Sequence, residues 1–220
     1  MRAGAEKRRP LPFLNSSRPL PDRNGDGVSR ASDYPAATLL SETLFEQLQD
    51  ILHAERQLVK ALPKMAKAAR TPDLEGCFED HLAETQTQVE RLTEMFRLLG
   101  HKAKAKPCKG MAGLIAEGEE LIEESAEKDD FAADLGLIAA AQKVEHYEMS
   151  AYLAARTLAS QAGIIDVARL LGETLLEEER ADKLLNRIAV LLMETAGKAP
   201  VAAVGEEREA EEYETEEVES

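Results

Sequence analysis

The stretch VARLLGETLLEEERADKLLNRIAVLL, residues 167–192, repeats apolar side chains at the spacing of an amphipathic helix. Leu171 and Leu185 lie on its apolar stripe. Glu178 interrupts the stripe midway between them, and Asp182 follows one turn later. Glu and Asp are almost never fully buried unless they are paired. The stretch therefore predicts a core-facing helix that carries an acid where a core residue is expected.

Three other segments show the same periodicity, so the chain contains four long predicted helices. They cover residues 38–69, 72–99, 130–162 and 164–196. The first two and the last two are joined by only a few residues, which predicts two antiparallel hairpins. The connection from Gly100 to Asp129 is long enough to travel the length of the bundle, and it contains a short amphipathic helix near 111–124. These lengths predict an all-α, ferritin-like antiparallel four-helix bundle with a long crossover that contains a short helix.

The other three helices also carry acidic side chains on or beside their apolar stripes, near mid-length. Glu55 interrupts the first stripe. On the second helix, His81 lies within the stripe and Glu84 lies on its edge. Glu145 and Glu148 share one face of the third helix. None of these stripes contains a Lys or Arg that would neutralise the acids, and burying an unpaired carboxylate costs several kcal/mol or more. The pattern therefore predicts a cation site in the core, as in ferritin-like di-metal bundles.

Four segments also resemble the YciE/YciF family of bacterial ferritin-like proteins. They are HAERQLVKALPKMAKAA (53–69), LEGCFEDHLAETQTQVERLTEMFRLLG (74–100), AAQKVEHYEMSAY (140–152) and ETLLEEERADKLL (173–185). The resemblance covers about 45–195. It implies a rubrerythrin-like bundle, a homodimer, a di-metal centre and a link to stress responses. By position it implies metal ligands on all four helices, namely Glu55, Glu84, Glu145, Glu148, Glu178 and Asp182.

The ligand pattern departs from the usual one on two helices. Ferritin-like di-iron proteins commonly repeat Glu-x-x-His, whereas the second helix here reads His81-x-x-Glu84, and Asp182 stands where a rubrerythrin would place His. His81 still shares a helical face with Glu84, so it can ligate a metal or hydrogen-bond to that carboxylate. We therefore include His81 in the predicted ligand set. A set this rich in oxygen suits Fe or Mn better than Zn or Cu, and the expected cofactor is two Fe or Mn ions.

Two functions are compatible with such a site. Two metal ions bridged by carboxylates react with peroxide or O₂, which would oxidise Fe(II) or remove peroxide. The alternative is a non-catalytic helical stress or assembly protein with a structural or vestigial metal site. Tyr152, one turn beyond Glu148, is interpreted as a core residue, or alternatively as a hydrogen-bond donor or redox-active neighbour of the site.

The net charge of −15 is unevenly distributed along the chain. Residues 1–36 are Pro-rich and carry a small basic excess, which predicts a disordered arm, and residues 201–220 predict a disordered acidic tail. Residues 37–200 form the predicted bundle. The acidic excess argues against binding to nucleic acids or anionic membranes, and no apolar run is long enough to span a bilayer. With two cysteines and no secretory signal, the expected location is the cytoplasm.

The arm also contains a sequence that resembles the start of a calcium-binding loop. Asp22, Asn24 and Asp26 have the spacing of its first ligands. Pro21 and Pro35 flank the segment without a helical pattern before it, whereas a calcium hand needs a helix on each side. We interpret the segment as a turn-rich linker.

Overall fold

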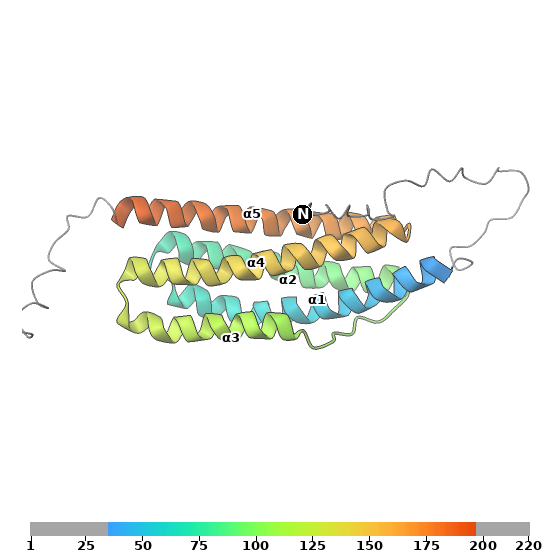
Figure 1. Ribbon diagram of the computed structural model, residues 1–220, viewed down its shortest axis with the longest axis horizontal. Helices are drawn as coiled ribbons and strands as arrows, with labels where there is room; N and C mark the ends of the chain where they lie inside the picture. The colour runs from blue at the N-terminus through green and yellow to red at the C-terminus, as the bar shows by residue number, and fades with distance from the viewer. Residues whose placement is uncertain (1–34, 197–220) are drawn as a thin grey trace, which may run out of the picture.

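Four long helices and one short helix make up the fold of the computed structural model, which describes residues 35–196 (Figure 1). The elements in chain order are α1 (Pro35–Ala68), α2 (Pro72–Leu98), α3 (Lys109–Glu124), η2 (Ser125–Glu127), α4 (Asp130–Gln161) and α5 (Ile165–Ala196). Each predicted helix is present, with its ends within three residues of the predicted ends. The calcium-like loop, nearly all of the predicted arm and the predicted acidic tail lie outside the described residues.

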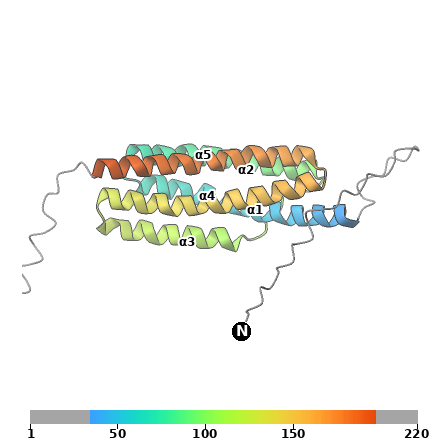
Figure 2. The ribbon, with the colours of Figure 1, turned by 45° about the horizontal axis from the view of Figure 1, so that its top comes forward.

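The helices are connected as two hairpins that lie side by side along the long axis of the molecule (Figures 1 and 2). α1 packs mainly on α2, and α4 packs mainly on α5. After α2 the chain returns toward the other end of the bundle through α3, which lies against α1 and α4, so α4 runs parallel to α2. This long crossover is the connection expected of a ferritin-like bundle, and the predicted fold class is confirmed. None of the described helices is long and apolar enough to cross a membrane.

The core consists of two apolar clusters, one toward each end of the bundle. One includes Leu62, Phe78 and Leu185, and the other includes Leu48 and Phe96. On every long helix of the bundle, buried polar side chains lie near the boundary between the two clusters. The core is therefore interrupted by one polar layer, which contains most of the predicted ligands.

A buried carboxylate outside that layer holds the α1–α2 turn against α4. Asp134 is fully buried, and its Oδ1 accepts the Arg70 N–H at 2.8 Å. Its Oδ2 accepts the Thr71 N–H at 2.9 Å and the Thr71 hydroxyl at 2.6 Å. Thr71 occupies the position before α2 that its sequence predicts for an N-cap, but its hydroxyl donates to Asp134 instead of capping the helix. These bonds fix the two hairpins relative to each other.

The crossover is attached to the bundle where α3 begins. Cys108 is buried, and its Sγ accepts the Met111 N–H at 3.4 Å, which caps α3. The same Sγ lies 2.9 Å from the Tyr147 hydroxyl, which donates to Asp50 Oδ2 at 3.1 Å. His53 Nδ1 accepts the Cys108 N–H at 3.2 Å. α1 and α4 therefore both hold the start of α3.

The Asp134→Ala substitution should destabilise the protein by about 2–4 kcal/mol, because it leaves the donors of the α1–α2 turn without an acceptor. Urea unfolding monitored by circular dichroism measures this change. Asp130→Ala is the matched control, since its carboxylate is exposed and lies 3.8 Å from Arg70 Nε. Equal stability losses in the two variants would contradict the role assigned to Asp134.

Candidate metal centre

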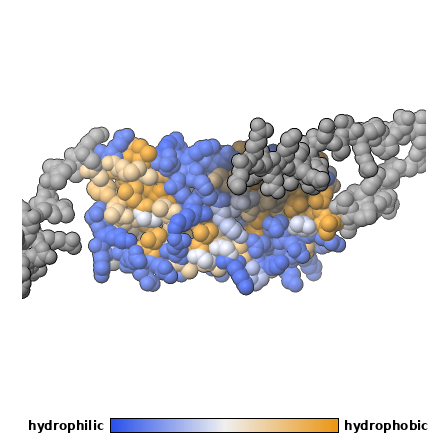
Figure 3. Space-filling view, viewed as in Figure 1, coloured by the Kyte–Doolittle hydropathy of each residue, from blue (hydrophilic) through white to orange (hydrophobic). Residues whose placement is uncertain are grey.

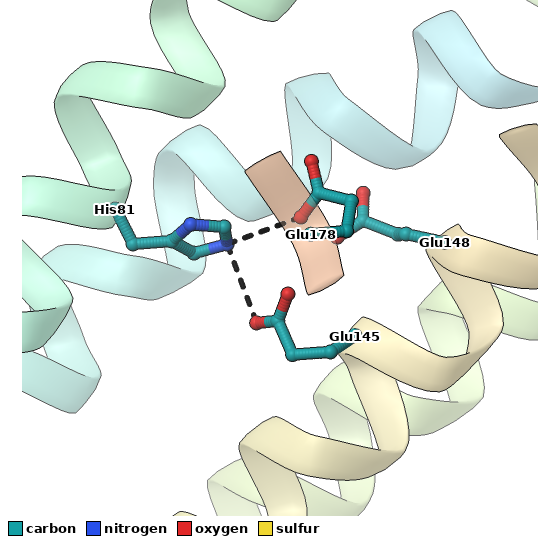
Figure 4. Close-up of side chains that lie close together, drawn as sticks. All are labelled: His81, Glu145, Glu148 and Glu178. Atoms are coloured by element: carbon teal, nitrogen blue, oxygen red, sulfur yellow. Dashed lines mark ion pairs between the residues drawn. The ribbon is translucent and has the colours of Figure 1, made fainter. Parts of the chain in front are cut away.

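Four side chains from three helices converge in the polar layer (Figure 4). His81 comes from α2, Glu145 and Glu148 come from α4, and Glu178 comes from α5. Each offers one ligand atom, and these atoms all lie within 4.8 Å of one another. His81 Nε2 is 3.3 Å from Glu145 Oε1 and 3.9 Å from Glu178 Oε2. The structure thus brings four of the predicted ligands into one buried group.

Glu55, the predicted ligand from α1, lies beside this group. It is fully buried, and its Oε1 accepts a short hydrogen bond from the Tyr152 hydroxyl. Its charge is close enough to His81 and Glu145 for each to shift its pKa. Tyr152 is itself fully buried, so it is both a core residue and the hydrogen-bond donor considered in the sequence interpretation. All four long helices therefore contribute an acid or a histidine to the layer.

Buried polar atoms without a hydrogen-bond partner are concentrated in this layer. Among the described residues they are Glu55 Oε2, His81 Nδ1 and Nε2, Gln88 Oε1, Glu145 Oε2, Glu148 Oε1 and Glu178 Oε2. Each unsatisfied buried group costs about 1–3 kcal/mol, so one hydrophobic domain rarely retains several of them without a ligand. All but one belong to Glu or His side chains, which are metal-ligand types. The set therefore has the chemistry of a divalent cation site.

The carboxyl groups of the layer hold their protons more tightly than free glutamic acid does. Burial, together with neighbouring acids, raises the pKa of Glu148 and Glu178 well above its usual range. Burial also raises the pKa of Glu145, and it raises that of Glu55 to about 7 although Tyr152 and His81 oppose the shift. Without a cation, the layer is therefore partly protonated near neutral pH.

His81 is the one base in this group. Burial alone would lower its pKa, but Glu145, Glu84 and Glu55 outweigh that effect and raise the pKa to about 9. In the absence of metal, an imidazolium ion therefore offsets part of the negative charge. A metal ion has to displace the proton, because only neutral imidazole is a ligand.

A hydrogen-bond network between α2 and α5, which was not predicted from the sequence, orients Glu178. Gln88 is buried, and its Nε2 donates to Glu178 Oε1 at 2.5 Å and to Glu177 Oε2 at 3.2 Å. The Arg91 guanidinium donates two bonds to Glu177, at 2.6 and 2.8 Å, and one to Thr174 at 2.6 Å. Gln88 lies seven residues after His81, which places it two turns along the same helical face. That spacing could have predicted from the sequence that Gln88 faces the polar layer.

Glu84 and Asp182 lie at the margin of the layer, outside the group of four. Glu84 is half-exposed, with its Oε2 3.8 Å from His81 Nδ1, and the neighbouring His81 lowers its pKa. Asp182 Oδ1 accepts a hydrogen bond from Gln142 Nε2 at 3.0 Å and lies 3.4 Å from His146 Nε2. A ligand role for these two acids stays a prediction.

Comparison with known proteins identifies the family. A family model described as a domain of unknown function (DUF892) matches residues 39–215, which include nearly the whole bundle. The chain belongs to the DUF892 family. Protein YciF of Escherichia coli K12 is 42% identical over 152 residues, which are 69% of this chain and 90% of YciF. The resemblance inferred from the four sequence segments is therefore confirmed.

Solved structures of two relatives have the same fold as this DUF892 bundle. The crystal structure of the E. coli stress protein YciF has a TM-score of 0.67 at 39% identity and covers 70% of this chain and 97% of YciF. YcfI from Rhodopseudomonas palustris, provisionally described as a structural protein, has a TM-score of 0.63 at 39% identity, over 67% of this chain and 92% of its own. The bundle is thus shared with a stress protein and with one thought to be structural.

The pKa shifts predict how the stability of the metal-free DUF892 bundle depends on pH. The pKa of Glu55 rises from 4.5 to about 7 and that of His81 from 6.5 to about 9, so the folded state binds more protons than the unfolded chain between these values. Stability is then lost as pH rises through this window, by an amount on the order of a few kcal/mol. Urea midpoints of chelator-treated protein should be higher at pH 6 than at pH 9.

The Glu55→Gln variant serves as a control for this dependence, because it removes one of the groups whose pKa is raised and should make the loss of stability near pH 7 less steep. A wild-type midpoint that is constant or increases from pH 6 to pH 9 would contradict the assigned protonation states.

Proposed function

We propose that this DUF892 protein binds two Fe or Mn ions in the polar layer and uses them to oxidise Fe(II) or to remove peroxide in a stress response. One observation carries the proposal: four glutamates and one histidine from all four long helices are buried together, and each retains an unpartnered ligand atom. Among the described residues, no Lys or Arg forms an ion pair with any of the five. The residues present therefore fit a cationic cofactor.

The composition of the donor set supports Fe or Mn as the metal. Four carboxylates and one imidazole form a mainly hard, oxygen-rich set, whereas Zn and Cu sites usually have more nitrogen or sulfur donors. Cys77 lines the outer side of the same region, but burial and nearby acids raise its pKa to about 11, so its thiol stays protonated. We therefore assign the ligand role to Glu55, His81, Glu145, Glu148 and Glu178.

Other side chains of the chain keep these ligands in place. Tyr152 donates to Glu55 and Gln88 donates to Glu178, so one oxygen of each carboxylate is fixed and the other is available. Ligands that are oriented by such hydrogen bonds bind metal more tightly. Burial raises the pKa of Tyr152 well above its usual range, so the phenol keeps the proton that it donates.

The apolar clusters on either side of the layer keep water from the ligands along the bundle axis. A pair of Fe or Mn ions supplies two one-electron changes to peroxide or O₂, which no side chain of the layer can supply by itself. The acids and His81 release protons when metal binds, and they can take protons up again when the metal leaves. Metal binding to the layer is therefore linked to its protonation.

Metal analysis tests the proposal directly. Protein purified without a metal-binding tag and reloaded with Fe(II) or Mn(II) should hold about two ions per chain. Glu178→Ala should bind far less metal, because it removes a ligand from α5, whereas Glu179→Ala should keep the wild-type amount, since Glu179 pairs with Lys183 outside the layer. Wild-type protein that binds no metal, or a Glu178→Ala variant that keeps its metal, would contradict the site.

Turnover assays then separate the two activities. Consumption of peroxide by the loaded protein supports peroxide removal, and consumption of O₂ with accumulation of Fe(III) supports Fe(II) oxidation. Loaded protein that does neither favours the alternative, a non-catalytic stress or assembly protein with a structural ion. The provisional description of YcfI as structural is the observation that favours this second candidate.

The Glu148→Met variant distinguishes a selected metal site from a structural polar layer. Glu148 is buried with one unpartnered oxygen, so an apolar side chain of similar size should stabilise the metal-free protein by about 1–2 kcal/mol while it lowers metal binding. Thermal unfolding with chelator and metal titration measure both effects. If Glu148→Met instead destabilises the metal-free bundle, the layer contributes to the fold without a cation.

We propose further that the protein acts in the cytoplasm as a homodimer. Several exposed apolar side chains support an interface on α5, among them Ile165, Leu176 and Leu191. Figure 3 shows apolar surface near the end of the bundle where α5 finishes. Light scattering after gel filtration measures the mass in solution, and a monomer at micromolar concentration would contradict the dimer.

A further inference from the structure

A cleft opens at the side of the bundle between α2, α4 and α5. Its volume is about 740 Å³, and α2 contributes His81 and Glu84 to its lining. α4 contributes Gln142 and His146, and α5 contributes Asp182 together with several basic residues. The cleft is therefore lined by polar side chains of three helices, and two of its acids belong to the predicted ligand set.

The floor of the cleft is part of the buried ligand group. His81 is only 5% exposed, yet it lines the cleft, and neither of its ring nitrogens has a hydrogen-bond partner. Its Nε2 faces Glu145 and Glu178 inside the layer, while its Nδ1 lies 3.8 Å from Glu84 Oε2 on the cleft side. One side chain thus links the cleft to the buried carboxylates.

We infer that this cleft is the port through which hydrated divalent cations reach the buried site, with Glu84 and Asp182 as transient ligands on the way. The inference rests on the proposed metal binding. It assigns the two marginal acids to ion uptake and leaves the five buried side chains as the resident ligands.

The contacts of the two acids fit transient binding. The Glu84 carboxylate lies 3.8 Å from His81 and 3.8 Å from Arg180, which are long ion pairs that a cation can replace at small cost. Glu84 is half-exposed and lines the cleft, so its carboxylate is open to a cation that enters from solvent. Asp182 is 22% exposed, and Gln142 and His146 hold its Oδ1 from one side.

The arrangement of charge favours a cation over an anion near the floor. The basic side chains of the lining extend into solvent, with Arg180 67% and Lys183 70% exposed. Glu84 lies beside the ligand group, with its Oε2 3.8 Å from His81 Nδ1, and Asp182 is the least exposed of the charged side chains named here, at 22%. Along the bundle axis, apolar clusters cover the layer on both sides, so the cleft is the polar approach that the described residues provide.

The rate of metal uptake tests this inference. Metal-free full-length protein is mixed with Co²⁺ in a stopped-flow instrument, and the visible absorption of bound Co²⁺ is followed. The double variant Glu84→Gln/Asp182→Asn should load about tenfold more slowly than wild type, because the attractive charges of the port are removed. The final number of ions per chain should be unchanged. Added salt should slow wild type more than the variant, since screening weakens the same attraction.

The matched control is Glu94→Gln/Glu173→Gln, which removes two exposed carboxylates from the same two helices, outside the cleft. It should load at the wild-type rate.

The inference is overturned if the port variant loads as fast as this control. It is also overturned if the port variant binds fewer ions at equilibrium, because Glu84 and Asp182 would then be resident ligands. Circular dichroism confirms that each variant is folded, and Glu84→Gln alone, which alters one half-exposed side chain, should show a smaller slowing.

Failure of the port and failure of the metal site give different results. If wild-type protein binds no Co²⁺ at equilibrium, the proposed site itself is wrong. If wild type binds Co²⁺ and the three proteins load at equal rates, the site stands and the port is wrong.

Discussion

The electrostatic balance of one buried layer is the constraint on which the rest of the structure depends. Four carboxyl groups and one imidazole lie between two apolar clusters, where water cannot solvate their charge. Protonation and the imidazolium of His81 balance this charge only in part, since several ligand atoms stay unpartnered. The two clusters supply the hydrophobic stabilisation that holds the layer in the middle of the bundle. A divalent cation is the simplest group that satisfies the layer without changing the fold.

The topology of the bundle brings the side chains of this layer together. The long crossover makes α4 parallel to α2, and it places the two acids of α4 beside His81. Two sets of hydrogen bonds outside the layer hold the helices in this arrangement. Asp134 binds the α1–α2 turn. The contacts of Cys108 with α1 and α4 position the start of α3. Their role is to fix the rotation and height of the helices, on which the distances between ligands depend.

Membership of the DUF892 family places the bundle beside a stress protein and a protein provisionally described as structural. The polar layer connects these two descriptions. A helical scaffold without a metal function would gain stability by replacing the buried acids with apolar residues. The buried acids, their unpartnered atoms and the open cleft at His81 fit the metal binding that we propose for this chain.

Local sequence determined the helices, their pairing into hairpins and the face on which each acid lies, because periodicity, end signals and loop lengths act within one segment. The burial of Glu55, Glu145 and Glu178 was predictable for this reason, since each interrupts an apolar stripe. The tertiary structure alone decided that Glu84 and Asp182 stay at the margin, that Gln88 orients Glu178, and that Asp134 binds a turn more than sixty residues away. Contacts between helices depend on their relative rotation and height, and one residue of offset turns a side chain by about 100°. No single helix contains that information.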